Sequence, residues 1–225
     1  MTNDKNHIYI YHHLGLGDHI SCHGIVRYYC EEYKKVSIFA KPKYANNIKY
    51  MYNDIQNLEI IPADDPEVRA YIDTNKLSNV LYVGFRLNPE DNFVAQFYKM
   101  ANVPIEYEYT KFYINRDLAR EKKLFDSLQI NEYEYIFVHD ESIKNSELIT
   151  KQNLPIIIPN HGDFFDWIYT ILHAKEIHCI DSSFVCLVDL LDTKDIPIFN
   201  HRYAKNYPAY ITLNPKPHKF WNIIK

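Results

Sequence analysis

The stretch Tyr9-Ile-Tyr-His-His-Leu-Gly-Leu-Gly-Asp-His-Ile20 decides the fold, because it reads as a strand that stops at two glycines and turns directly into a helix. Gly15 and Gly17 allow a tight backbone turn and leave no side chain between the backbone and a ligand. The helix that follows offers unpaired N–H groups and the positive end of its dipole, which suit an anion or the start of an active site. The motif lacks the third glycine of the dinucleotide fingerprint, and glycines at such turns are also often purely structural.

Short apolar strands then alternate with amphipathic helices. Apolar residues from Ile20 to Tyr33 recur at mostly three- and four-residue spacings, which is the period of a helix. The elements expected next are strands over 35–40, 58–62 and 79–85, helices over 44–52, 66–74 and 93–100, and an irregular or extended link over 102–109. This rhythm with short connections predicts a parallel sheet with helices on both faces.

A second alternation follows a charged helix over 116–128. Its expected elements are strands over 133–139, 154–158, 176–181 and 196–199, helices over 163–173 and 182–191, and a short terminal helix over 220–224. The two alternations predict an α/β fold of two small Rossmann-like lobes, residues 1–115 and 116–225, with a cleft between them. In such sheets, ligands bind beyond the carboxyl ends of the strands.

Composition excludes several classes of protein. The 225 residues are 47% hydrophobic, enough for a real core, and a net charge of −4 with no long basic run argues against a nucleic-acid partner. The four cysteines show no CxxC or metal spacing and are expected as reduced core thiols. There is no apolar stretch of signal-peptide length and none of the roughly 20 residues that a membrane span needs, so a cytoplasmic location is expected. The oligomeric state is left open.

A second strand-turn-helix, Cys179-Ile-Asp-Ser-Ser-Phe184, mirrors the first. Ser182 and Ser183 offer hydroxyl groups beside the free N–H groups of a helix start, which is a suitable seat for a phosphate. In the alternative interpretation, Asp181 or Ser182 only caps its own helix.

Together the two motifs resemble the glycosyltransferases of the GT-B fold, above all the heptosyltransferase-like group, glycosyltransferase family 9. Leu14-Gly-Leu-Gly-Asp18 is similar to the strand and "LGD" with which these enzymes begin. Ile180-Asp-Ser-Ser-Phe-Val-Cys-Leu-Val188 is similar to the "DS(G/S)xxxHLA" of their C-terminal lobe, with Cys186 where they usually have His. The likeness covers most of the chain in order and spacing.

The resemblance implies a nucleotide-sugar donor, a saccharide acceptor, no metal and no cofactor. Carried over by position, Asp18 is the base that activates the acceptor hydroxyl, and Ser182 and Ser183 hold the donor diphosphate beside Asp181. A carboxylate suits this role because the hydroxyl must lose its proton as it attacks the anomeric carbon. The alternative for Asp18 is an N-cap of a helix that begins at His19.

Further candidates lie near the same two edges. His139 and Lys144 end or follow the first strand of the second lobe, on the edge that carries Ser182, and are assigned to the donor. Lys144 and Arg86 are candidates for the cation that neutralises the departing nucleoside diphosphate, although either type of residue is more often a solvated surface charge. The acceptor or phosphate contacts expected in the first lobe are Gly15, Gly17, His19 and Arg86.

Four histidines around the opening turn, His12, His13, His19 and His23, raise the question of a metal. His19 and His23 lie four residues apart on one helix face, but Ile20 stands where an HExxH motif has its glutamate. No metal site is therefore predicted.

Three functions are compatible with these motifs. The first is a glycosyltransferase of glycan biosynthesis that moves a sugar from a nucleotide-diphosphate sugar to a glycan or lipid-linked saccharide. The second is a nucleotide-sugar epimerase or hydrolase on the same scaffold, and the third is a non-catalytic module that binds nucleotides or sugars. The fold does not decide among them, and the resemblance favours the first.

Overall fold

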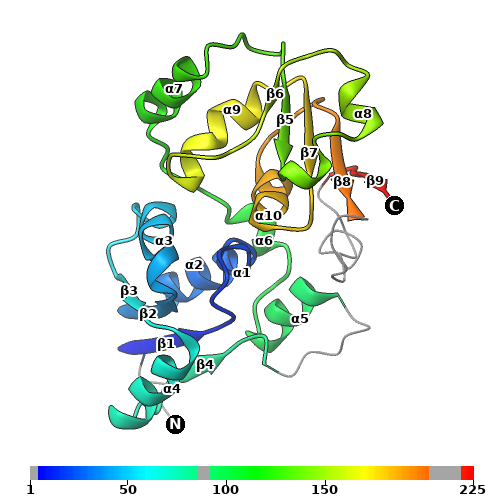
Figure 1. Ribbon diagram of the computed structural model, residues 1–225. Coiled ribbons are helices and arrows are strands. Elements are labelled where there is room, and N and C mark those ends of the chain that lie inside the picture. The colour runs from blue at the N-terminus through cyan, green and yellow to red at the C-terminus, as the bar shows by residue number, and fades with distance from the viewer. Residues whose placement is uncertain (1–4, 86–91, 203–218) are drawn as a thin grey trace. The chain divides into compact units, whose positions relative to one another are not determined.

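The computed structural model describes residues 5–85, 92–202 and 219–225 (Figure 1). The chain divides into two compact units, of which the first covers Met1–Asn115 and the second begins at Arg116. Each unit has its own sheet and its own covering helices. The cleft between the lobes, and their acceptor and donor roles, stay predictions.

The first unit is built on a four-stranded parallel sheet in the order β3-β2-β1-β4. Its strands are β1 (His7–Tyr11), β2 (Lys35–Ala40), β3 (Leu58–Pro62) and β4 (Val80–Tyr82). Its helices are α1 (Leu16–Ser21), α2 (His23–Glu32), η1 (Pro42–Tyr44), α3 (Ala45–Met51), α4 (Asp65–Thr74), α5 (Phe93–Met100) and α6 (Tyr107–Thr110). Because β1 pairs on both sides, its Ile10 lies opposite Ile38 and Leu81, and its apolar residues are buried.

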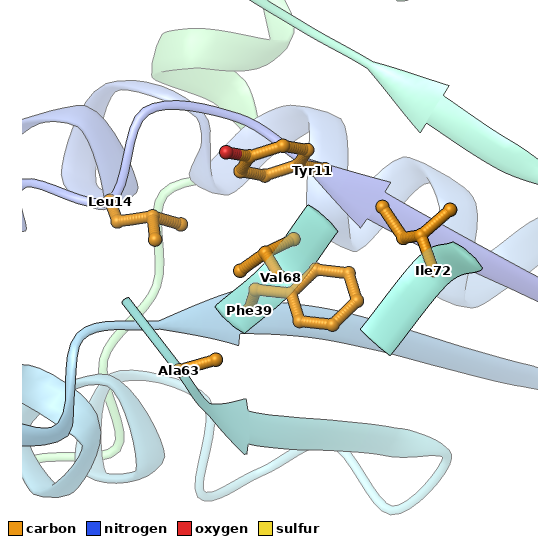
Figure 2. Close-up of a cluster of buried hydrophobic side chains, with 6 residues drawn as sticks. All are labelled: Tyr11, Leu14, Phe39, Ala63, Val68 and Ile72. Atoms are coloured by element: carbon orange, nitrogen blue, oxygen red, sulfur yellow. The ribbon is translucent and has the colours of Figure 1, made fainter. Parts of the chain in front are cut away.

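Helix α4 closes one face of this sheet. It starts at the predicted place, with Asp64 and Glu67 forming a capping box and Pro66 in the first turn. Val68 and Ile72, one turn apart, therefore lie on the same face. Figure 2 shows both packing toward Phe39 of β2 and Tyr11 of β1, in a cluster with Leu14 and Ala63. This cluster lies directly beneath the chain that follows β1.

The second unit has a five-stranded parallel sheet in the order β6-β5-β7-β8-β9. Its strands are β5 (Ile136–His139), β6 (Ile156–Ile157), β7 (Glu176–Cys179), β8 (Ile198–His201) and β9 (Asn222–Ile224). Its helices are α7 (Leu118–Ser127), η2 (Glu141–Ile143), α8 (Glu147–Thr150), η3 (Phe164–Trp167), α9 (Ile168–Leu172) and α10 (Ser183–Leu190). The predicted α/β class, with a parallel sheet in each lobe, is confirmed.

Three local expectations were wrong. The opening helix begins at Leu16, and the single helix expected up to Tyr33 is two helices that meet at Cys22. Residues 107–110 form a short helix instead of an extended link. The terminal segment is a strand, because Ile223 pairs with Asn200 of β8, where a helix was expected.

Two further features bear on the sequence expectations. All four cysteines are free, and Cys22, Cys179 and Cys186 are buried while Cys30 is only half-buried. Among the described residues, no helix is both long and apolar enough to cross a bilayer.

Candidate active site

The carboxyl edge of the first sheet holds Asp18. Gly15 is the N-cap of α1 in an extended conformation, so Leu16, Gly17 and Asp18 form the first turn of the helix. Asp18 folds back toward the cap, and a β-carbon on Gly15 would lie 2.5 Å from its Oδ2 atom. Gly15 is therefore required by close approach of the carboxyl group. The alternative that Asp18 caps a helix starting at His19 is wrong, because Gly15 is the cap and Asp18 is the third residue of α1.

Burial raises the pKa of the Asp18 carboxyl group, which makes it a stronger base than an exposed aspartate. Backbone N–H groups of Gly15 and Asp18 donate to the carboxylate and act in the opposite direction, as do the neighbouring side chains of His13 and Lys41. The arrangement is that of a partly buried carboxylate kept near two basic side chains.

Both basic residues are held in place by the ends of neighbouring strands. His13 donates through Nε2 to the Gly84 carbonyl, which follows β4, at 2.9 Å. Lys41 directly follows β2, and its Nζ atom lies 3.8 Å from Asp65 Oδ2. Lys41 was missed from sequence, although its position just after a parallel strand is the signal that would have identified it.

Other first-lobe candidates are less accessible. His19 is fully buried with its ring 4.3 Å from that of His12, so contact with a phosphate would require its surroundings to open. Gly17 lies inside α1, and its carbonyl accepts a hydrogen bond from the Ser21 hydroxyl at 3.0 Å. Arg86 lies outside the described residues.

In the second unit, Ser182 is the N-cap of α10. Its Oγ atom accepts from the Phe184 N–H group at 3.2 Å and lies 3.1 Å from His139 Nδ1, at the end of β5. The capping role considered from sequence is therefore real, and His139 stands beside the same hydroxyl as expected from their shared edge. Cys186 is buried within α10, and its thiol donates to the Ser182 carbonyl at 3.6 Å.

Asp181 and Asn200 join this edge. Asn200, within the fully buried part of β8, donates through Nδ2 to Asp181 Oδ1 at 2.7 Å. Sequence reasoning missed Asn200, since a single asparagine in an apolar strand carries no periodic signal. The carboxyl ends of β5, β7 and β8 thus bring together His139, Asp181, Ser182 and Asn200.

Two remaining candidates have simpler surroundings. Ser183 is the first residue of α10 and is half-buried. Lys144 forms an ion pair with Glu141 at 3.4 Å, and within the described residues no hydrogen bond or ion pair joins it to Ser182. No group of three or more His, Cys, Asp or Glu side chains arranged to hold a metal occurs in the described parts of the chain.

Comparison with known proteins was made by sequence and by structure. No protein-family model matches the sequence, and no curated protein matches it significantly. The structure is similar to the glycosyl transferase family 9 protein of Veillonella parvula DSM 2008, with a TM-score of 0.58, 9% identity, and coverage of 100% of this chain and 88% of that chain. It is also similar to the E. coli ADP-heptose lps heptosyltransferase II, with a TM-score of 0.53, 11% identity, and coverage of 96% and 89%.

Identities this low establish a shared fold and nothing finer. The resemblance seen in the two sequence motifs therefore extends to the whole structure. This chain has the Rossmann-like α/β fold found in glycosyl transferase family 9 and heptosyltransferase structures.

Proposed function

We propose that this protein is a glycosyltransferase that moves a sugar from a nucleotide-diphosphate sugar to a saccharide acceptor, with a carboxylate base and without a metal. The observation that carries the proposal is Asp18, a partly buried carboxyl group with a raised pKa at the carboxyl edge of a parallel sheet. Support comes from the shared fold with structures whose names describe glycosyl transfer, one of them from an ADP-heptose donor.

In the proposed reaction, Asp18 accepts the proton of an acceptor hydroxyl. The hydroxyl oxygen forms a bond to the anomeric carbon of the donor sugar as the bond from that carbon to the diphosphate oxygen breaks. The nucleoside diphosphate leaves with the electron pair of that bond. A raised pKa favours this step, because a base accepts a proton best when its pKa approaches the working pH.

The donor diphosphate is assigned to the start of α10. Ser182 and Ser183 supply hydroxyl groups beside the free N–H groups and the positive dipole end of this helix. His139 extends the polar surface through its contact with Ser182. Asp181, oriented by Asn200, is assigned to the hydroxyl groups of the donor, since a carboxylate repels phosphate. Lys144 is assigned to neutralise the negative charge of the departing nucleoside diphosphate.

The experiment is a measurement of nucleoside diphosphate release from a panel of nucleotide sugars, made with and without a mixture of saccharide acceptors. Release that depends on the acceptor supports transfer. Release of equal rate without any acceptor identifies a hydrolase instead. Binding of a nucleotide, seen as a raised thermal midpoint without any release, identifies a non-catalytic module.

A further inference from the structure

A small aromatic pocket lies in the first unit, where α4 meets the ends of β1 and β4. Its volume is about 360 Å³, at the low end of the roughly 300–1,000 Å³ of small-molecule sites. It is lined by Tyr11, Arg69, Ile72, Asp73, Tyr82 and Phe85.

Three aromatic rings form its walls. The ring centroids of Tyr11 and Phe85 are 4.6 Å apart, and Tyr82 lies 6.0 Å from Tyr11 and 6.4 Å from Phe85. Tyr82 is 49% exposed, so the face of its ring is accessible to a ligand. Such rings present flat apolar faces of the kind that pack against the C–H face of a sugar ring.

The position of Phe85 depends on the preceding turn. Gly84 has a φ of +91°, and a β-carbon there would lie 2.7 Å from atoms of both His13 and Phe97. Only glycine fits this left-handed and crowded site. The sequence therefore specifies the turn that brings Phe85 against the Tyr11 ring.

Polar groups stand on the helix side of the pocket. Arg69 and Asp73 are four residues apart on α4 and so project from the same face. Within the described residues no ion pair joins Arg69 to Asp73, and the Arg69 side chain shares a hydrogen bond with the Tyr11 hydroxyl. The other N–H groups of the Arg69 guanidinium and the carboxylate of Asp73 suit the hydroxyl groups of a neutral sugar, which both donate and accept.

The pocket adjoins the Asp18 site. The Phe85 ring lies 5.2 Å from that of His13, the residue whose charge acts on the Asp18 carboxyl group. The Tyr11 hydroxyl donates to Asp65 Oδ1 at 3.0 Å, and Asp65 is the partner of Lys41. One continuous set of contacts thus joins the pocket to the base.

We propose that this pocket binds one neutral sugar ring of the saccharide acceptor, with the ring stacked on Tyr82 and Phe85 and its hydroxyl groups bonded to Arg69 and Asp73. The identification of the bound sugar as the acceptor rests on the proposed function. A nucleobase, which also stacks on aromatic rings, is the competing occupant that the test must separate.

The test is saturation-transfer NMR of the full chain with methyl glycosides of glucose, galactose, N-acetylglucosamine and mannose, and with uridine as the nucleobase probe. At least one glycoside is expected to bind. Tyr82→Ala should weaken that binding about tenfold, the effect of losing roughly 1.4 kcal/mol of stacking and contact. Arg69→Gln combined with Asp73→Asn should weaken it to a similar extent, because the hydroxyl partners are lost.

The matched control is Tyr113→Ala, which removes another tyrosine of the same unit, 54% exposed and outside the pocket. It should bind the glycoside as the unaltered protein does, and circular dichroism should show all variants folded. Absence of glycoside binding, equal binding by Tyr82→Ala, or preferential binding of uridine in a Tyr82-dependent manner would overturn the proposal.

This readout uses neither donor nor turnover, so it separates two kinds of failure. Acceptor-dependent release of nucleoside diphosphate without glycoside binding would support the transferase and contradict the role of the pocket. Glycoside binding without any release of nucleoside diphosphate would support the saccharide site and contradict the transferase.

Discussion

Ser182 has two interactions at once, as the cap of α10 and as the hydroxyl beside His139. Ser182→Ala should reduce the free energy of unfolding by about 1 kcal/mol, the usual effect of a lost N-cap. It should also weaken binding of ADP, UDP or GDP, whichever binds best, by about tenfold. Calorimetry measures the affinity and chemical denaturation measures the stability.

The matched control for this residue is Ser182→Thr, which keeps a hydroxyl group able to cap and to bind phosphate. It should restore most of both properties. If Ser182→Ala lowers stability while leaving the nucleotide affinity unchanged, Ser182 is a cap alone and the assignment of the diphosphate fails.

At the scale of single residues, sequence patterns located motif residues better than isolated ones. Asp18 and Ser182 were identified because each follows a strand and starts a helix. Asn200 was missed because it is one polar residue with no local pattern, and Lys41 because its position after β2 was not used as a signal, although strand pairing brings it to the edge. Of the two interpretations of Asp18, the N-cap is wrong because Gly15 caps α1, and the base stays a prediction.

At the scale of elements, the cluster beneath the opening turn depends on Phe39, which is fully buried in β2 against α4. Phe39→Ala should lower the free energy of unfolding of the first unit by about 3–5 kcal/mol, through lost burial and a cavity. The control is Phe220→Ala, because Phe220 is 99% exposed and its loss should change stability by less than about 0.5 kcal/mol. Equal effects in urea denaturation would contradict the described core.

Elements with a clear period or cap were predictable, and short ones were not. The α4 start was found from its proline and acidic cap, and α5 from its apolar spacing. Strand β9 has only three residues, too few to show alternation, and it forms because β8 offers a free edge. No local signal distinguishes such a segment from a helix turn.

At the scale of the whole molecule, buried histidines make stability depend on pH. Burial lowers the pKa of His12, His178 and His201 to about 4 and that of His23 to about 3, and it lowers the pKa of His19 as well. The unfolded chain, with histidine pKa values near 6.5, therefore binds more protons than the folded chain at mildly acidic pH. Stability is fully present above about pH 6.5 and is lost as the pH falls toward 4.

The corresponding test uses His23→Gln, whose amide can still donate to the Glu108 carbonyl that His23 Nε2 contacts at 2.7 Å. This variant should flatten the fall of stability below pH 6.5 by about 1.4 kcal/mol per pH unit, the effect of one proton. His161→Gln, at an exposed histidine, should leave the slope unchanged. Thermal midpoints measured from pH 7.5 to 4.5 compare the three proteins, and identical slopes would contradict the buried, neutral state of His23.

The two-unit α/β architecture was predictable because strands and helices alternate twice along the chain, a regularity that short irregular elements do not obscure. The glycine turn after the first strand and the serine turn at 181–183 then located the two carboxyl edges. The substrates follow from neither, since the same fold hosts different chemistries.

In the proposed reaction, Asp18 is the base for glycosyl transfer. Asp18→Asn should lower acceptor-dependent release of nucleoside diphosphate by about 100- to 10,000-fold. Burial raises the pKa of this carboxyl group, so the stability it contributes is lost as the pH rises, and an amide here should keep or raise the thermal midpoint at pH 7.5. Donor affinity should be unchanged, because the donor is assigned to the other unit.

The matched control is Asp64→Asn, the same change at an exposed capping residue near the same edge, where asparagine caps as well as aspartate. The most direct measurement is therefore acceptor-dependent nucleoside diphosphate release by the unaltered protein, Asp18→Asn and Asp64→Asn under one set of conditions. We expect release by the unaltered protein and by Asp64→Asn and its loss in Asp18→Asn, with donor binding intact in all three. Undiminished release by folded Asp18→Asn would contradict this role of Asp18.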